Sequence, residues 1–178
     1  MQKVLFIFAE LSDDDIDWII STGTAMNISS GGILIAEGKP VDALYIILEG
    51  AFKVSVGMSG IDKKIAILGS GEVVGEMSFI DARMPSATVE AIADSFVLGI
   101  PRSLLADKLK HDVNFSSHFY RAIAIFLSHR LRGIVSQLGY GEAAVNDDFD
   151  PQSLPPDTLD NVPLANARFD WLLRRLKK

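Results

Sequence analysis

Hydrophobic residues follow two different spacings along the chain, and the change from one to the other divides the sequence into regions. From Ala25 to Ile100 the apolar residues come in short runs that are separated by glycines. Such runs between turn signals are typical of short strands in an antiparallel sandwich or barrel, not of repeated βαβ units. The predicted strands are Ile33–Ala36, Leu44–Leu48, Ala51–Val56, Lys63–Leu68, Ser86–Ala91 and Phe96–Ile100.

A short helix is predicted before these strands. Ser12 precedes three consecutive aspartates, and Asp15 occupies the position at which an acidic side chain completes a capping box. Ile16, Ile19 and Ile20 then follow with helical spacing. We expect an amphipathic entry helix that packs on the core.

Two helices are predicted after the strands, so the fold class is mainly β with flanking helices. Pro101 suits the first turn of a helix that runs through Leu109. A longer helix extends from about Phe115 to Leu138, and one of its sides must cover the strands. The stripe of apolar residues along this helix is wide enough to pack also against a second helix from a partner subunit. Packing on the core alone and packing in a dimer seam therefore remain as alternatives for this helix. The apolar residues are Phe115, Phe119, Ile123, Phe126, Leu127, Leu131, Ile134 and Leu138.

The C-terminal part of the chain differs in composition. Residues 141–163 are acidic and contain four prolines, as a linker or a surface loop does. Residues 164–178 predict an amphipathic helix with Phe169 and Leu172 on its apolar face. We therefore divide the chain into a domain at 1–140, a linker at 141–163 and a final helix, which either docks on its own domain or is offered to a partner.

Composition excludes several classes of function. The net charge of −6 and the pI near 5.0 argue against a general nucleic-acid binder, because phosphate contacts need a basic surface. The chain has no cysteine, which excludes disulfides and thiolate chemistry. The apolar run Val4–Ala9 is too short for a signal peptide or a membrane span. We expect a cytoplasmic, soluble protein without stable membrane insertion.

Catalytic and metal-binding patterns are not found in the sequence. His111, His118 and His129 fall in predicted helices, and no third ligand accompanies the last two. Neither a nucleophile elbow nor a dinucleotide fingerprint in its βαβ context is present. We expect neither an enzyme nor a metal or cofactor site.

Residues 75–89 carry the most specific signal in the chain. A short helix is predicted to begin at Gly75, where a glycine lets the backbone approach a ligand closely. Free amides at a helix start attract anions. Glu76 is unexpected beside an anion, and it would more plausibly accept hydrogen bonds from a sugar hydroxyl. A turn with Arg83 and Pro85 then leads into the strand at Ser86.

This stretch resembles the phosphate-binding cassette of the cyclic nucleotide-binding domain family. The family pattern is Gly-Glu-x-(Ser/Ala)-(Leu/Phe), a short gap, and Pro-Arg-(Ser/Ala)-Ala-(Thr/Ser)-Val. The resemblance extends over about residues 5–138 and implies a β-roll, or jelly-roll, domain that acts as a regulatory sensor. The matching residues are Gly75, Glu76, Ser78, Phe79, Ser86, Ala87, Thr88 and Val89.

The resemblance also implies a ligand, cAMP or cGMP, and a role for each matching residue. Glu76 would hold the ribose 2′-hydroxyl, and the backbone amides of Met77, Ser78, Ser86 and Ala87 would hold the cyclic phosphate. The sequence does not choose between adenine and guanine, and Tyr140, Phe149 and Trp171 are equal candidates for an aromatic residue that caps the base.

Pro85 is the main departure from the family pattern, because relatives carry an arginine there that neutralises the phosphate. A charge-assisted hydrogen bond contributes on the order of 1.5–3 kcal/mol, which corresponds to roughly 10- to 100-fold in affinity. Arg83 lies two residues earlier, and its long side chain either reaches back to the ligand or remains a solvated turn arginine.

Three functions remain in competition. The first is a stand-alone regulatory module that binds a cyclic mononucleotide and passes the signal, through helix movement, to a protein partner. It would form a homodimer through the helix at about 115–138, and it would not bind DNA, since the segment after Leu138 does not resemble a recognition helix. The second is a degenerate domain that serves as a nucleotide-independent dimerisation or interaction scaffold. The third is an adaptor for a transcription regulator or a transporter.

Overall fold

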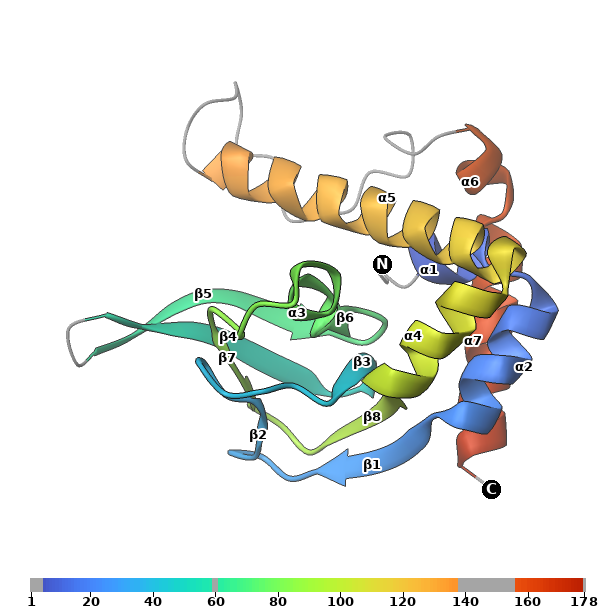
Figure 1. The fold of residues 1–178 in the computed structure, drawn as a ribbon. Coiled ribbons are helices and arrows are strands. Elements are labelled where there is room, and N and C mark those ends of the chain that lie inside the picture. Colours follow the sequence, from blue (N-terminus) through green and yellow to red (C-terminus); the bar gives the residue numbers. More distant parts are fainter. Residues whose placement is uncertain (1–4, 59–60, 138–155, 178) are drawn as a thin grey trace.

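The computed structural model describes residues 5–58, 61–137 and 156–177. Their strands form two four-stranded antiparallel sheets, in the orders β1-β8-β3-β6 and β2-β7-β4-β5, which together make the predicted β-roll (Figure 1). The strands are β1 Thr24–Ile28, β2 Ile33–Ile35, β3 Ala43–Glu49, β4 Ala51–Met58, β5 Ile61–Gly69, β6 Val73–Val74, β7 Thr88–Ala91 and β8 Ser95–Pro101.

Two apolar clusters hold the fold together. One lies between the two sheets and includes Ile47, Phe52 and Val97, none of which is exposed. The other lies between the roll and the helices and includes Leu98 of β8 and Phe115 of α5 (Val113–Gln137). Strands β3 and β8 contribute residues to both clusters, so these two strands connect the packing between the sheets with the packing of the helices on the roll.

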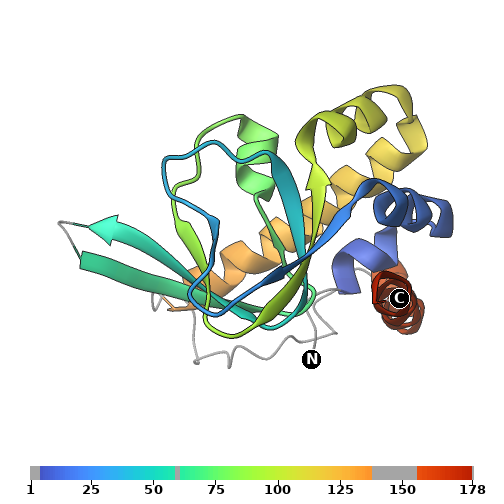
Figure 2. The ribbon, with the colours of Figure 1, turned by 90° about the horizontal axis from the view of Figure 1, so that it is seen from below.

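The helices gather at one end of the roll, and α5 extends from them across the roll (Figures 1 and 2). The other helices of this end are α1 (Leu5–Glu10), α2 (Asp13–Thr22), α4 (Arg102–His111) and α7 (Val162–Leu176). The predicted capping box of α2 is confirmed, because the Asp15 amide donates to Ser12 Oγ and the Ser12 amide donates to Asp15 Oδ2.

The predicted long helix is confirmed as α5, but its N-terminal end differs from the predicted one. It begins at Val113, two residues before the predicted start, because Asp112 caps it by accepting a hydrogen bond from the Phe115 amide at 2.9 Å. Leu138, the predicted end of this helix, lies outside the described residues.

The C-terminal helix docks on its own domain, which was one of the two predicted alternatives. The ring of Phe169 packs edge-on against Phe8 of α1, with 5.8 Å between the ring centroids. Arg168 donates to Asp13 Oδ1 at 2.7 Å and to the Phe8 carbonyl at 2.9 Å. The tail is therefore part of the helical end of the molecule.

Helical structure in the C-terminal part of the chain begins before residue 164, the predicted start of the final helix. Within 141–163, residues Pro156–Asp160 form a short helix, α6, and α7 begins at Val162 because a proline fits its first turn. The first part of the predicted linker lies outside the described residues.

Besides α6, three elements were not predicted from the sequence. Helices α5 and α7 both pack on α1 and bury Ile7, Phe8 and Ala9. Its sequence is therefore a continuous apolar run, which lacks the helical periodicity that would have predicted a helix. Strand β1 mixes polar and apolar residues, and β6 contains two residues. These two strands exist because β8 and β3 provide their hydrogen-bonding partners.

Candidate functional site

The site is built on helix α3 (Glu76–Asp81), which begins where the sequence predicted it. Gly75 precedes it with φ +90°, a left-handed conformation that favours glycine. A Cβ at this position would also lie 3.0 Å from the Ala43 carbonyl oxygen. The glycine is thus required by backbone geometry, independently of any ligand.

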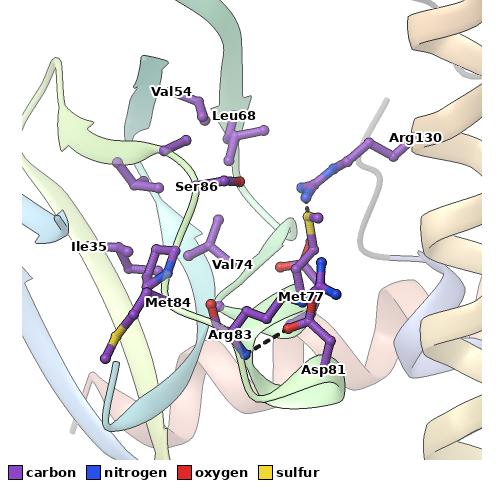
Figure 3. A pocket seen from close by; sticks show the side chains of 16 residues that line it. Ile35, Val54, Leu68, Val74, Met77, Asp81, Arg83, Met84, Ser86 and Arg130 are labelled. Carbon is purple, nitrogen blue, oxygen red and sulfur yellow. Dashed lines mark hydrogen bonds and ion pairs between the residues drawn. The ribbon is translucent and has the colours of Figure 1, made fainter. Parts of the chain in front are cut away.

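A cavity of about 230 Å³ opens between α3, the turn after it and the sheet that contains β4 and β7. Its floor is apolar, and Figure 3 shows Ile35, Val54, Leu68 and Val74 around it. This volume is below the roughly 300–1,000 Å³ of most sites for drug-sized ligands, so part of a ligand of that size would lie outside the cavity.

The structure brings seven of the eight predicted site residues to this cavity. They are Gly75, Glu76, Met77, Ser78, Arg83, Ser86 and Ala87. The eighth residue, Thr88, does not line the cavity. Its Oγ1 accepts a hydrogen bond from the Glu37 amide at 3.1 Å, so its hydroxyl connects β7 to the loop after β2.

Glu76 is buried and has a partner that the sequence analysis did not identify. Its side chain accepts a hydrogen bond from Nη1 of Arg130 on α5 at 2.6 Å, and the residue as a whole is 2% exposed. Nη2 of Arg130 donates to the Val73 carbonyl at 3.3 Å. The predicted contact with a sugar hydroxyl is therefore occupied, in this structure, by an intramolecular ion pair.

Burial raises the pKa of Glu76, and it is the largest influence on that carboxyl group. The Arg130 guanidinium lowers the pKa, as do the backbone amides of Glu76 and Met77, and the nearby Glu72 raises it. The net direction is upward, so Glu76 is easier to protonate than an ordinary carboxyl group.

Arg130 could have been identified from its spacing on α5. Phe119, Ala122, Ile123 and Phe126 form the buried side of the helix, and Arg130 is the next residue in that series. A cation at a core-facing position requires a buried partner. Its guanidinium also lies 4.5 Å from the ring centroid of Phe126, which fixes its direction.

Arg83 lies at the mouth of the cavity and is largely in solvent. Its side chain is 85% exposed, and its Nε is 3.9 Å from Asp81 Oδ2 (Figure 3). Pro85 donates no hydrogen bond, and its carbonyl oxygen accepts one from the Gly38 amide at 2.9 Å. The orientation of Arg83 matches the solvated turn arginine rather than the one that reaches back.

Helix α3 contacts the helical end through aromatic rings. Phe79 packs edge-on against Phe119 of α5, with 6.0 Å between the ring centroids. The Arg102 guanidinium lies over the Phe79 ring, 5.6 Å from its centroid. Together with the Glu76–Arg130 pair, this packing connects the cavity to α5 at two points.

Other candidate groups lie away from the cavity. His118 Nδ1 is 2.8 Å from Asp15 Oδ2, which places this histidine at the contact of α5 with α2. Within the described ranges, no group of three or more potential ligands could hold a metal ion. Trp171 lies at the groove between α2 and α7 and does not line the cavity, whereas Tyr140 and Phe149 lie outside the described residues.

Comparison with known proteins identifies the fold and the family of the β-roll. Residues 25–112 match the family model of the cyclic nucleotide-binding domain. The fold resembles the crystal structure of a cyclic nucleotide-binding domain from Methylobacillus flagellatus KT, with a TM-score of 0.70 and 22% identity over 81% of this chain and 85% of that one. It also resembles the Thermus thermophilus catabolite activator protein, with a TM-score of 0.61 and 18% identity over 97% of this chain and 86% of that one. At these identities the structural likeness shows the fold alone.

Residues 25–112 of this chain therefore belong to the cyclic nucleotide-binding domain family. This domain is a regulatory fold, and no helix-turn-helix domain is evident among the described residues after α5, because α7 packs on α1 and α2.

A curated relative, glutaminase 2 of Bradyrhizobium diazoefficiens, is 30% identical over 125 residues, which are 70% of this chain and 19% of that protein. The chain spans about a fifth of the length of the first curated relatives that it matches. Because several curated relatives, among them this glutaminase, have the names of enzymes, the expectation that the protein is not an enzyme stays a prediction. None of the described helices has the length and apolarity needed to cross a bilayer.

Proposed function

We propose that this protein is a regulatory module that binds a cyclic mononucleotide, cAMP or cGMP, in the cavity beside α3. The observation that supports this most is the arrangement around the cavity. The buried side chain of Glu76, the exposed Ser86 and the start of α3 lie around one apolar floor. The ribose would contact Glu76, and the phosphate would lie against the amides of Met77, Ser78, Ser86 and Ala87.

The Glu76–Arg130 pair suggests how binding would reach α5. A ribose hydroxyl that donates to Glu76 competes with the Nη1 hydrogen bond from Arg130, and Arg130 is part of α5. Loosening this bond would allow α5 to move relative to α3, while the Phe79–Phe119 contact would limit the movement. Such a switch requires that the ligand binds the two arrangements with different affinity.

Helix α5 also offers a surface for output. Tyr120, Leu131 and Val135 are exposed, with helical spacing, on a side of α5 away from its buried residues. An apolar stripe of this kind suits the same helix of a second copy or a helix of a protein partner. We propose the homodimer as the first assembly to test and the cytoplasm as its location.

Isothermal titration of the full chain with cAMP and with cGMP tests the proposal. We expect saturable binding to wild type and a loss of at least tenfold in affinity for Glu76→Ala, because a hydrogen bond to a charged group contributes on the order of 1.5–3 kcal/mol. The matched control is Glu90→Ala, which removes a carboxylate that pairs with Lys53 and does not line the cavity. Equal affinities of wild type and Glu76→Ala would refute the assigned role of Glu76.

A nucleotide-independent scaffold is the second candidate, and a specific observation favours it. Arg130 donates a hydrogen bond to the buried Glu76, so this carboxylate has a partner without a ligand. Pro85 leaves the phosphate without its usual arginine. Absence of both heat and a thermal shift at millimolar nucleotide would favour this function, and the α5 stripe or the α7 surface would then carry the activity, as it would in an adaptor.

A further inference from the structure

The charges that line the cavity balance one another. The charged residues in its described wall are Glu76, Asp81, Arg83 and Arg130. Each arginine lies beside one of the carboxylates, at 2.6 Å for Arg130 with Glu76 and at 3.9 Å for Arg83 with Asp81. A cyclic phosphate, which carries one negative charge, would therefore enter a wall without a surplus cation.

Glu76 experiences most of this added charge because it is buried in the wall while Asp81 is exposed to solvent. Water screens a charge at the mouth, whereas a buried carboxylate is screened much less. If Arg130 turns towards the phosphate, Glu76 loses its ion pair. If Arg130 stays, Glu76 remains a carboxylate next to a new anion. Both arrangements disfavour the ionised form of Glu76.

We propose that the site binds its anionic ligand together with one proton, and that Glu76 receives this proton. The inference rests on the proposed function and adds a form of regulation to it. The proton comes from solvent and neutralises the carboxylate. A protonated Glu76 keeps one carbonyl oxygen that can accept a hydrogen bond from a ribose hydroxyl. Arg130 is then free to donate to the phosphate in place of the arginine that Pro85 replaces.

The groups around Glu76 support this assignment. Burial already raises the pKa of Glu76, while Arg130 from α5 opposes the rise most strongly. Glu72, which precedes β6, also raises the pKa of Glu76. Its Oε2 accepts a hydrogen bond from the Gly69 amide at 2.7 Å. Arg83 and Asp81 at the mouth are the other charged residues of the described wall. A ligand anion changes this balance in the direction of protonation.

Linkage gives the sign of the effect. If the complex holds more protons than the free protein, affinity rises as the pH falls, by at most tenfold per pH unit for one proton. The dependence is confined to the interval between the pKa of Glu76 in the free protein and its higher pKa in the complex. An uncharged ligand such as adenosine should show a weaker dependence.

Titration of the full chain with cAMP, in pairs of buffers with different ionisation enthalpies, measures the protons taken up on binding. We expect up to one proton for wild type, no uptake for Glu76→Gln, and reduced uptake for Pro85→Arg, which supplies a cation. Pro85→Arg should also increase the affinity at alkaline pH roughly 10- to 100-fold. This variant keeps the test decisive if Glu76→Gln is unstable.

The outcomes separate the two proposals. Saturable binding without proton uptake overturns this inference and leaves the proposed function intact. Uptake that persists in Glu76→Gln overturns the assignment to Glu76. Absence of binding by wild type at any pH overturns both.

Discussion

Replacement of Arg130 by methionine, which is similar in length and uncharged, tests how the cavity and α5 are connected. Glu76 is 2% exposed and the Arg130 side chain is 28% exposed, so the pair is mostly shielded from water. Removing one partner of a fully buried pair costs about 3–5 kcal/mol. Because Arg130 is partly solvated and Glu76 can take up a proton, we expect about 2–4 kcal/mol at neutral pH.

Chemical denaturation and thermal melting measure this change. For a chain of this size, about 2–4 kcal/mol corresponds to a decrease in Tm of roughly 4–16 °C. The double variant Arg130→Met with Glu76→Gln should recover part of the loss, because no buried charge remains without a partner. Arg132→Met is the matched control, since Arg132 is an exposed arginine of the same helix.

The penalty for Arg130→Met should also depend on pH. Without Arg130, the folded-state pKa of Glu76 lies further above its unfolded value, because the largest opposing influence is gone. The folded protein then binds more protons than the unfolded chain between these two values, so stability falls as the pH rises from about 4.3 towards the raised value. The penalty is smallest in acid. A pH-independent penalty, or additive effects of the two substitutions, would refute the ion-pair reasoning.

Two further predictions concern the helices. Phe169→Ala should destabilise the protein by about 3–5 kcal/mol in denaturant titrations, because Phe169 is buried between α7 and α1, whereas Trp171→Ala, at a 39% exposed position, should change stability much less. Leu131→Glu should convert the proposed dimer to a monomer in sedimentation experiments, because Leu131 is 61% exposed on α5. Leu104→Glu, at an exposed position of α4, is the control. A monomeric wild type would contradict the proposed dimer seam.

The strands and helices that could be predicted were those whose signals are local. Gly50 separates β3 from β4 and has φ +95°, a conformation that a glycine adopts readily, so the turn was visible in the sequence. Ser12 and Asp15 cap α2 within four residues of each other. In contrast, β1 and β6 depend on partner strands distant in sequence, which no local pattern encodes.

The predicted site residues belong to a contiguous motif, whereas Arg130, the partner that the sequence analysis did not identify, is distant in sequence. Seven of the predicted residues lie together because they belong to α3 and the strand entry after it. Arg130 is 54 positions from Glu76 in sequence, and it meets Glu76 because α5 crosses the roll at that point. Thr88 belongs to the same motif but does not line the cavity, and its hydroxyl accepts a hydrogen bond from the Glu37 amide.

The Glu76–Arg130 pair connects the two main hypotheses to one equilibrium. In a scaffold the pair is permanent, and it stabilises the packing of α5 on α3 whatever the solution contains. In a sensor the ligand competes with the same pair, so the free energy needed to break the pair reduces the net free energy of ligand binding. In a sensor, weakening the pair should therefore lower the stability of the free protein. It should also make it easier for the nucleotide to displace α5. A scaffold would show the loss of stability alone.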